Sequence, residues 1–186
     1  MSMEMRGESA EGKRRGEPAG TEARSELVRG EARAQAAGLE IRIMTDADIS
    51  AVAGMEERCF PDAWSTHIVS ELLTSGMDYC RVAFLDGAAA GYENVRVIGD
   101  EAELMRICTA PEFRGRGIGT MLLEAGLRDM REHGAVSATL EVRPGNVPAI
   151  RLYEAHGFQV EGRRKNYYRS PVEDALIYWN RKIAKD

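Results

Sequence analysis

The segment Arg114-Gly115-Arg116-Gly117-Ile118-Gly119-Thr120 decides the fold of this 186-residue chain. Ile118, Met121, Leu122 and Ala125 recur at the spacing of one helical face, which predicts an amphipathic helix opened by a glycine-rich loop. Glycines there let the backbone approach a ligand, and free N–H groups of a first helical turn favour an anion such as a pyrophosphate. The segment matches neither a dinucleotide fingerprint nor a Walker A loop. Taken alone, it is equally typical of a simple turn with a helix start.

Strands and helices alternate on both sides of this loop. Apolar runs predict strands at 41–43, 79–85, 90–97, 102–109, 138–142, 158–160 and 175–179. Helices are expected from Thr45 or Asp46 to Cys59, from Ser65 to about Gly76, from Ile118 to His133 and from Asn146 to Ala155. The alternation, interrupted by one hairpin, predicts an α/β domain with a mixed sheet.

Composition divides the chain into two parts. All four Phe, two Trp and six Tyr residues lie at or after Phe60, and residues 1–39 contain no aromatic residue and no isoleucine. Too few large apolar side chains are present there to offset the entropy lost on ordering. We therefore expect residues 1–39 to form a disordered or partly helical tail and residues 40–186 to form one domain.

Composition also excludes several classes of protein. No apolar run approaches the ~18 residues that span a bilayer, and residues 1–39 lack the apolar core of a signal peptide. Three cysteines without a Cys-x-x-Cys pair argue against a disulfide framework or zinc ribbon and favour a reducing cytoplasm. The net charge of −5 argues against general nucleic-acid binding. We expect a cytoplasmic protein that needs no metal and binds neither membrane nor nucleic acid.

Motifs further along the chain carry a family resemblance. The segments Leu140-Glu141-Val142-Arg143, Asn166-Tyr167-Tyr168 and Glu173-Asp174, with Phe60-Pro61-x-x-Trp64-Ser65 upstream, resemble the RimI branch of the GNAT acyltransferase superfamily. The resemblance covers about residues 41–179. It implies the GNAT fold, a mixed and mostly antiparallel sheet of about seven strands flanked by about four helices. It also implies transfer of acetyl from acetyl-CoA to the N-terminal α-amine of a protein, in this branch the N-terminal alanine of a small-subunit ribosomal protein.

The resemblance assigns binding residues as well. In the family the pantetheine amides pair with the strand before the loop, which here contributes Ile107, Cys108 and Thr109. The pyrophosphate lies on the loop amides, here those of Arg114, Gly115, Arg116, Gly117, Ile118, Gly119 and Thr120. Asn146 is either only a helix cap or also a ligand of CoA. Tyr167 and Tyr168 either border the substrate groove or pack within a strand.

Two matched residues have roles that chemistry supports. An α-amino group with a pKa of about 7.7–8.0 is partly neutral at pH 7, whereas a lysine near 10.4 is almost wholly charged. One carboxylate therefore suffices to activate an N-terminus, and Glu141 matches the base of the family. Tyr153 matches the acid that protonates the departing thiolate, since its phenol is protonated at pH 7. An exposed strand glutamate and a core aromatic residue are the structural alternatives.

Some positions depart from the branch. Arg106 stands where asparagine is usual, and Cys108-Thr109-Ala110 replaces Ala-Val-Asp. Pantetheine pairing uses the backbone and tolerates these side chains, but Arg106 would repel a basic peptide, which argues against the ribosomal substrate more than against the reaction. Two alternatives stay open: a GNAT enzyme acting on lysine side chains or a small amine, and a non-catalytic CoA-binding or ribosome-associated module. We expect a monomer or weak dimer.

Overall fold

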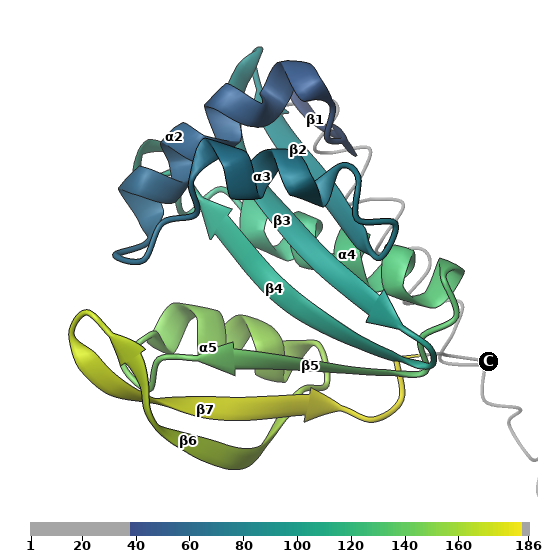
Figure 1. Ribbon diagram of the computed structural model, residues 1–186, viewed down its shortest axis with the longest axis vertical. Helices are drawn as coiled ribbons and strands as arrows, with labels where there is room; N and C mark the ends of the chain where they lie inside the picture. The colour runs from purple at the N-terminus through teal and green to yellow at the C-terminus, as the bar shows by residue number, and fades with distance from the viewer. Residues whose placement is uncertain (1–37, 184–186) are drawn as a thin grey trace, which may run out of the picture. The chain divides into compact units, whose positions relative to one another are not determined.

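The computed structural model describes residues 38–183, so the prediction for residues 1–39 lies almost wholly outside it. Seven strands form one sheet in the order β1-β2-β3-β4-β5-β7-β6 (Figure 1). They are β1 (Leu39–Ile43), β2 (Asp78–Leu85), β3 (Ala88–Ile98), β4 (Glu101–Thr109), β5 (Ser137–Val142), β6 (Gln159–Arg169) and β7 (Val172–Asn180). Only the β4–β5 pair is parallel, which confirms the mixed, mostly antiparallel sheet.

Helices cover both faces of this sheet. They are α2 (Ile49–Cys59), α3 (Thr66–Leu72), α4 (Ile118–Glu132) and α5 (Val147–Ala155), with short 3-10 turns η1 (Asp46–Asp48) and η2 (Pro111–Phe113). Figure 1 shows α2 and α3 in front of the sheet and α4 behind it. Each layer has its own core: Val52, Met55 and Val69 pack with Tyr92 in front, and Leu123 and Met130 pack with Val95 behind. Within residues 38–183, no helix is both long and apolar enough to cross a membrane.

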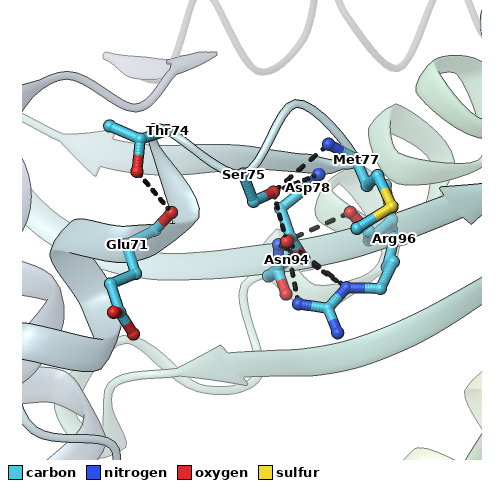
Figure 2. Close-up of polar contacts among 8 residues, drawn as sticks. Glu71, Thr74, Ser75, Met77, Asp78, Asn94 and Arg96 are labelled. Atoms are coloured by element: carbon cyan, nitrogen blue, oxygen red, sulfur yellow. Dashed lines mark hydrogen bonds and ion pairs between the residues drawn. The ribbon is translucent and has the colours of Figure 1, made fainter.

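The turn between α3 and β2 is fixed by a buried carboxylate (Figure 2). The side chain of Asp78 accepts hydrogen bonds from Ser75 Oγ at 2.5 Å, Asn94 Nδ2 at 3.3 Å and Arg96 Nη2 at 2.8 Å. Thr74 Oγ1 donates to the carbonyl of Glu71 at 3.1 Å. The backbone N–H groups of Leu73 and Thr74 bond to the carbonyls of Ser70 and Glu71, three residues back, so the regular helix α3 ends at Leu72, earlier than the predicted end near Gly76.

The last two strands are longer than the sequence predicts. β6 and β7 form a hairpin over 159–169 and 172–180, where short strands at 158–160 and 175–179 were expected. Most side chains of β6 are exposed, so the strand lacks the apolar alternation that marks a half-buried strand. Its register with β7 is also irregular, because bulges interrupt it after Val160 and after Arg164.

The parallel pair β4–β5 separates soon after it begins. Only Glu101, Ala102 and Glu103 pair with β5, opposite Ser137, Ala138 and Thr139. Beyond these residues the two strands diverge, as Figure 1 shows, and an irregularity between β3 and β4 at Asn94/Val95 accompanies the divergence. The remainder of β4 therefore keeps one edge of its backbone unpaired by β5.

Candidate active site

A cavity of about 560 Å³ lies where β4 and β5 diverge. It is lined by the α2–α3 loop, β4, β5, α5 and the β6–β7 hairpin, through Cys59, Phe60, Pro61, Asp62, Trp64, Glu103, Leu104, Met105, Arg106, Ile107, Glu141, Val142, Arg143, Asn146, Tyr153, Tyr167, Tyr168, Pro171 and Glu173. Six residues predicted from the sequence meet here: Ile107, Glu141, Asn146, Tyr153, Tyr167 and Tyr168.

Glu141 reaches the cavity because β5 alternates. Its neighbours Leu140 and Val142 are buried in the core behind the sheet, which turns the intervening side chain to the opposite face. The Glu141 side chain is only 11% exposed, and its Oε1 lies 3.1 Å from Nη1 of Arg164. The predicted base is thus an ion-paired carboxylate inside the cavity.

Tyr153 enters the cavity from α5. Its ring packs edge-to-face on Phe158 with centroids 6.1 Å apart, so the side chain is anchored in the core. Burial and the neighbouring Tyr168 raise the pKa of Tyr153. The phenol therefore keeps its proton at neutral pH and remains a donor.

Asn146 begins α5 and lines the cavity. Its side-chain oxygen accepts a hydrogen bond from the backbone N–H of Ala149 at 3.4 Å. The helix-cap role is therefore confirmed. Contact with CoA stays a prediction.

Tyr167 and Tyr168 are neighbours in sequence that both line the cavity. Successive residues of a regular strand face opposite sides, but the irregular pairing of β6 after Arg164 relaxes this rule. The two rings meet edge-to-face at 5.1 Å, and the guanidinium of Arg143 lies 3.9 Å from the ring centre of Tyr168. Burial raises the pKa of Tyr168 to about 12. The hydroxyl groups of Tyr167 and Tyr168 are therefore uncharged at neutral pH and can form hydrogen bonds where the β6–β7 hairpin lines the cavity.

The glycine-rich loop lies outside the cavity lining and has the geometry of an anion cradle. Gly115 and Gly117 adopt positive φ angles of 75° and 80°, which disfavour other residues. Gly117 is the N-cap of α4 and supplies no side chain to the free N–H groups of Ile118, Gly119 and Thr120. Arg114 Nε donates to the carbonyl of Thr109 at 3.2 Å, which ties the loop to the end of β4. Binding of the phosphate and pantetheine parts of acetyl-CoA by this loop and strand stays a prediction.

The three residues that are predicted to pair with pantetheine differ in their surroundings. Ile107 lines the cavity, Thr109 is half-buried, and Cys108 is buried in the front core against Cys59. Contact with Cys59 and burial both raise the pKa of Cys108, which keeps its thiol protonated. An acyl-cysteine at Cys108 is therefore disfavoured.

Glu103 is a cavity residue that the sequence analysis missed. It lies on β4 between the buried residues Ala102 and Leu104, a pattern that is equally typical of a solvent-facing strand position. Burial, the charge of Glu141 and a hydrogen bond to Glu141 raise the pKa of Glu103 to about 7. Only the separation of β4 from β5, which the sequence does not reveal, could have indicated this carboxylate.

Arg106 does not act as the free cation that was expected. Its Nε lies 3.7 Å from Glu56 and its Nη2 lies 3.6 Å from Asp62, and its guanidinium lies 4.5 Å and 4.7 Å from the ring centres of Phe60 and Trp64. The side chain is 13% exposed, and its charge is balanced by two carboxylates. The expectation that it would repel a basic peptide is therefore withdrawn.

Comparisons with known proteins place the relatives of this chain among acetyltransferases. The Acetyltransferase (GNAT) family profile matches residues 49–158. The [Ribosomal protein bS18]-alanine N-acetyltransferase of Salmonella typhimurium is 35% identical over 140 residues, which is 74% of this chain and 93% of the relative. The N-alpha-acetyltransferase RimI of Mycobacterium tuberculosis is 35% identical over 141 residues, 73% of this chain and 87% of the relative.

Solved structures give the same result. The crystal structure of the ribosomal-protein-S18-alanine N-acetyltransferase from Escherichia coli superposes with a TM-score of 0.72 at 29% identity, covering 80% of this chain and 96% of that one. The alignment spans nearly the whole E. coli enzyme. With the anion cradle, the cavity and the sequence matches together, the chain belongs to the GNAT acetyltransferase family, in its RimI branch.

Proposed function

We propose that the chain acetylates the α-amine at a protein N-terminus and that its substrate is the N-terminal alanine of ribosomal protein bS18. Relatives that it matches over most of their length carry this substrate in their names. The observation that carries the proposal is the meeting of Glu141 and Tyr153, from different elements, in one cavity beside the open edge of β4.

The charge of the cavity supports a cationic substrate. Four carboxylates and two guanidinium groups line it: Asp62, Glu103, Glu141, Glu173, Arg106 and Arg143. Arg106 is paired with Glu56 and Asp62, and Arg143 lies 2.9 Å from Glu173. With Arg106 and Arg143 engaged by other carboxylates, Glu141, whose ion-pair partner Arg164 is largely exposed, is the anionic group of the lining that an entering ammonium can contact.

Glu141 and Tyr153 would divide the proton transfers between them. The α-ammonium must lose a proton before its nitrogen can attack, and Glu141 is the carboxylate that the family resemblance assigns to this step. The nitrogen then attacks the thioester carbonyl directly, and a backbone N–H near Ile107 or Cys108 stabilises the oxyanion that develops. Tyr153 gives its proton to the departing sulfur, which leaves as the neutral thiol.

Paired peptides test the proposal. One peptide begins with a free alanine, and a second has the same sequence with a blocked N-terminus and an internal lysine. We expect CoA release and a mass increase of one acetyl group with the first peptide alone. Modification of the blocked peptide would assign the enzyme to lysine side chains, and absence of CoA release with every peptide would indicate a non-catalytic module.

A further inference from the structure

The cavity holds a second carboxylate beside the proposed base. Glu103 is the last residue of β4 that pairs with β5, and Glu141 follows two positions after its partner Thr139. Both side chains line the cavity, and burial together with the charge of Glu141 raises the pKa of Glu103. When two carboxyl groups lie side by side, the charge of one favours the protonated form of the other, so the pair binds a proton more readily than an isolated glutamate.

Two arginines and a tyrosine lie around the two carboxyl groups. Arg96 on β3 is the cross-strand partner of Glu103, but its guanidinium donates three hydrogen bonds to Asp78, as Figure 2 shows. From β6, Arg164 contacts Glu141, and Tyr167 lies close enough to both carboxylates for their charges to raise its pKa. Arg96 is therefore already engaged, and Arg164 is the cation that directly contacts the pair.

Arg164 differs from the other cations of the cavity in its exposure. Its side chain is 57% exposed, whereas that of Arg106 is 13% exposed and that of Arg143 is 21% exposed. Because most of its side chain lies in solvent, Arg164 can leave Glu141 without exposing a buried group, and a competing cation can take its place. The guanidinium thus lies where a substrate ammonium would lie to contact Glu141.

We propose that Glu103 and Glu141 act as one carboxylate pair that binds the incoming α-ammonium and accepts its proton, and that Arg164 occupies the ammonium position until substrate displaces it. This inference rests on the proposed function and adds two residues to it. Glu103 supplies a proton acceptor matched to the amine, because an acceptor that titrates near 7 is closer to an α-ammonium at about 7.7–8.0 than an ordinary glutamate at about 4.3.

The proton balance is complete without another reactant. One N–H bond of the ammonium breaks as an O–H bond forms on the pair, and the freed lone pair attacks the thioester carbon. The C–S bond breaks, and sulfur takes the phenolic proton of Tyr153. The second proton lost by nitrogen restores Tyr153, and the proton held by the pair passes to solvent. The net products are the amide, the thiol and one proton.

Glu103→Gln tests the pair through its pH profile. Glutamine keeps the size of Glu103 and donates a hydrogen bond to Glu141, so it imitates the protonated residue. At saturating acetyl-CoA, the ratio of wild-type to variant kcat should be near one at pH 5.5 and rise to about 10-fold as pH passes 7. Glu101→Gln, an exposed change on the same strand, is the control and should give a ratio of one throughout. A Glu103→Gln ratio that does not change with pH would overturn the proposal.

Arg164→Ala tests the displacement. Removing the competing cation should lower the KM for peptide several-fold with little change in kcat. Arg163→Ala removes a neighbouring arginine that pairs with Asp174 outside the cavity lining, and it should leave both constants unchanged. An unchanged or higher peptide KM in Arg164→Ala would contradict the role of Arg164.

A titration without turnover separates this inference from the proposed function. Carboxyl ¹³C NMR of the free wild-type enzyme should show Glu103 titrating near pH 7, and Glu141→Gln should lower that midpoint. A Glu103 midpoint near pH 4.5 would overturn the pair even in an enzyme that acetylates N-termini. Failure of the wild type on every peptide would overturn the proposed function, whatever the titration shows.

Discussion

At the scale of single residues, Tyr153 is the sharpest test of the mechanism. Its hydroxyl group is the proposed proton donor, while its ring is held by packing on Phe158. Tyr153→Phe should therefore lower kcat by about 10²-fold, the smaller end of the range for general acid catalysis, with acetyl-CoA affinity nearly unchanged. Steady-state kinetics and calorimetric titration with acetyl-CoA give the two numbers. An unchanged kcat would assign the proton to another donor.

For Glu141→Gln we expect the ratio of wild-type to variant rate to change with pH in the opposite direction to that for Glu103→Gln. At low pH more of the amine is protonated and Glu103 holds its own proton, so Glu141 is the acceptor that remains. The ratio of wild-type to variant rate should therefore be largest at pH 6 and shrink as pH rises toward 8. Rates at fixed acetyl-CoA across this range check it. A ratio that stays constant would argue that Glu141 only positions Arg164.

The parts of the site that sequence could predict are those carried by local chemistry. Glu141 and Tyr153 were assigned through the family resemblance of the motifs that contain them, and the alternation along β5 turns Glu141 away from buried Leu140 and Val142. Glu103 and Arg106 depend on where β4 leaves β5 and on which loop covers it. Such long-range geometry has no local sequence signal, and both residues were therefore missed or misinterpreted.

At the scale of elements, the loop between α2 and α3 forms one wall of the cavity, and Arg106 of β4 holds this loop. Buried Glu56 accepts a hydrogen bond from the backbone N–H of Trp64 at 2.7 Å, and Arg106 donates to the carbonyl of Asp62 at 3.0 Å. Arg106→Ala removes the support for this wall, because it leaves Phe60 and Trp64 without the guanidinium between them. We expect the peptide KM to rise several-fold and the acetyl-CoA KM to stay unchanged.

Kinetics with each substrate varied in turn measure this split. Arg58→Ala, which removes an exposed arginine paired with Glu112 outside the cavity lining, should change neither constant. Equal losses for both substrates in Arg106→Ala would mean that the arginine supports the whole fold instead of one wall.

Helix α4 and the β6–β7 hairpin show how far hydrophobic periodicity predicts the bounds of elements. The helix α4 was predicted within a residue at each end, because its apolar stripe and the glycines at its start are local. The hairpin of β6 and β7 was underestimated, because the exposed polar residues of β6 are held by pairing with β7 and not by burial. Strand length in this hairpin is a property of two strands together.

At the scale of the whole molecule, Glu93 makes stability depend on pH. It lies on β3 beneath α4, fully buried, and neither carboxyl oxygen has a hydrogen-bond partner among residues 38–183. Gly126 leaves the room it needs, since a Cβ there would lie 2.8 Å from Glu93 Oε2. Burial, reinforced by the charge of Asp129, raises the pKa of Glu93 well above its usual range.

The sign of the effect follows from proton linkage. In the unfolded chain Glu93 loses its proton near pH 4.5, whereas the folded state keeps that proton to higher pH. The contribution of Glu93 to the free energy of unfolding is therefore full below pH 4.5 and is lost as pH rises toward the folded pKa. Glu93→Gln should therefore gain stability relative to wild type by up to about 1.4 kcal/mol per pH unit above pH 5. Urea unfolding at pH 5, 6, 7 and 8 measures it. Glu57→Gln on the surface of α2 is the control, and a constant difference for Glu93→Gln would show that the carboxyl ionises freely in the folded state.

The early separation of β4 from β5 also bears on how the molecule avoids unwanted association. Unpaired backbone groups at the rim of a sheet are a template for aggregation, because a strand from another chain can pair with them. Here the unpaired edge of β4 lies in the interior of the sheet, flanked by β5 and the β6–β7 hairpin. A neighbouring protein would have to insert a whole strand between two halves of one sheet to reach it. A thin, flexible molecule can enter instead. The unpaired backbone N–H and C=O groups of β4 are thus accessible to small partners and inaccessible to the strands of other folded chains.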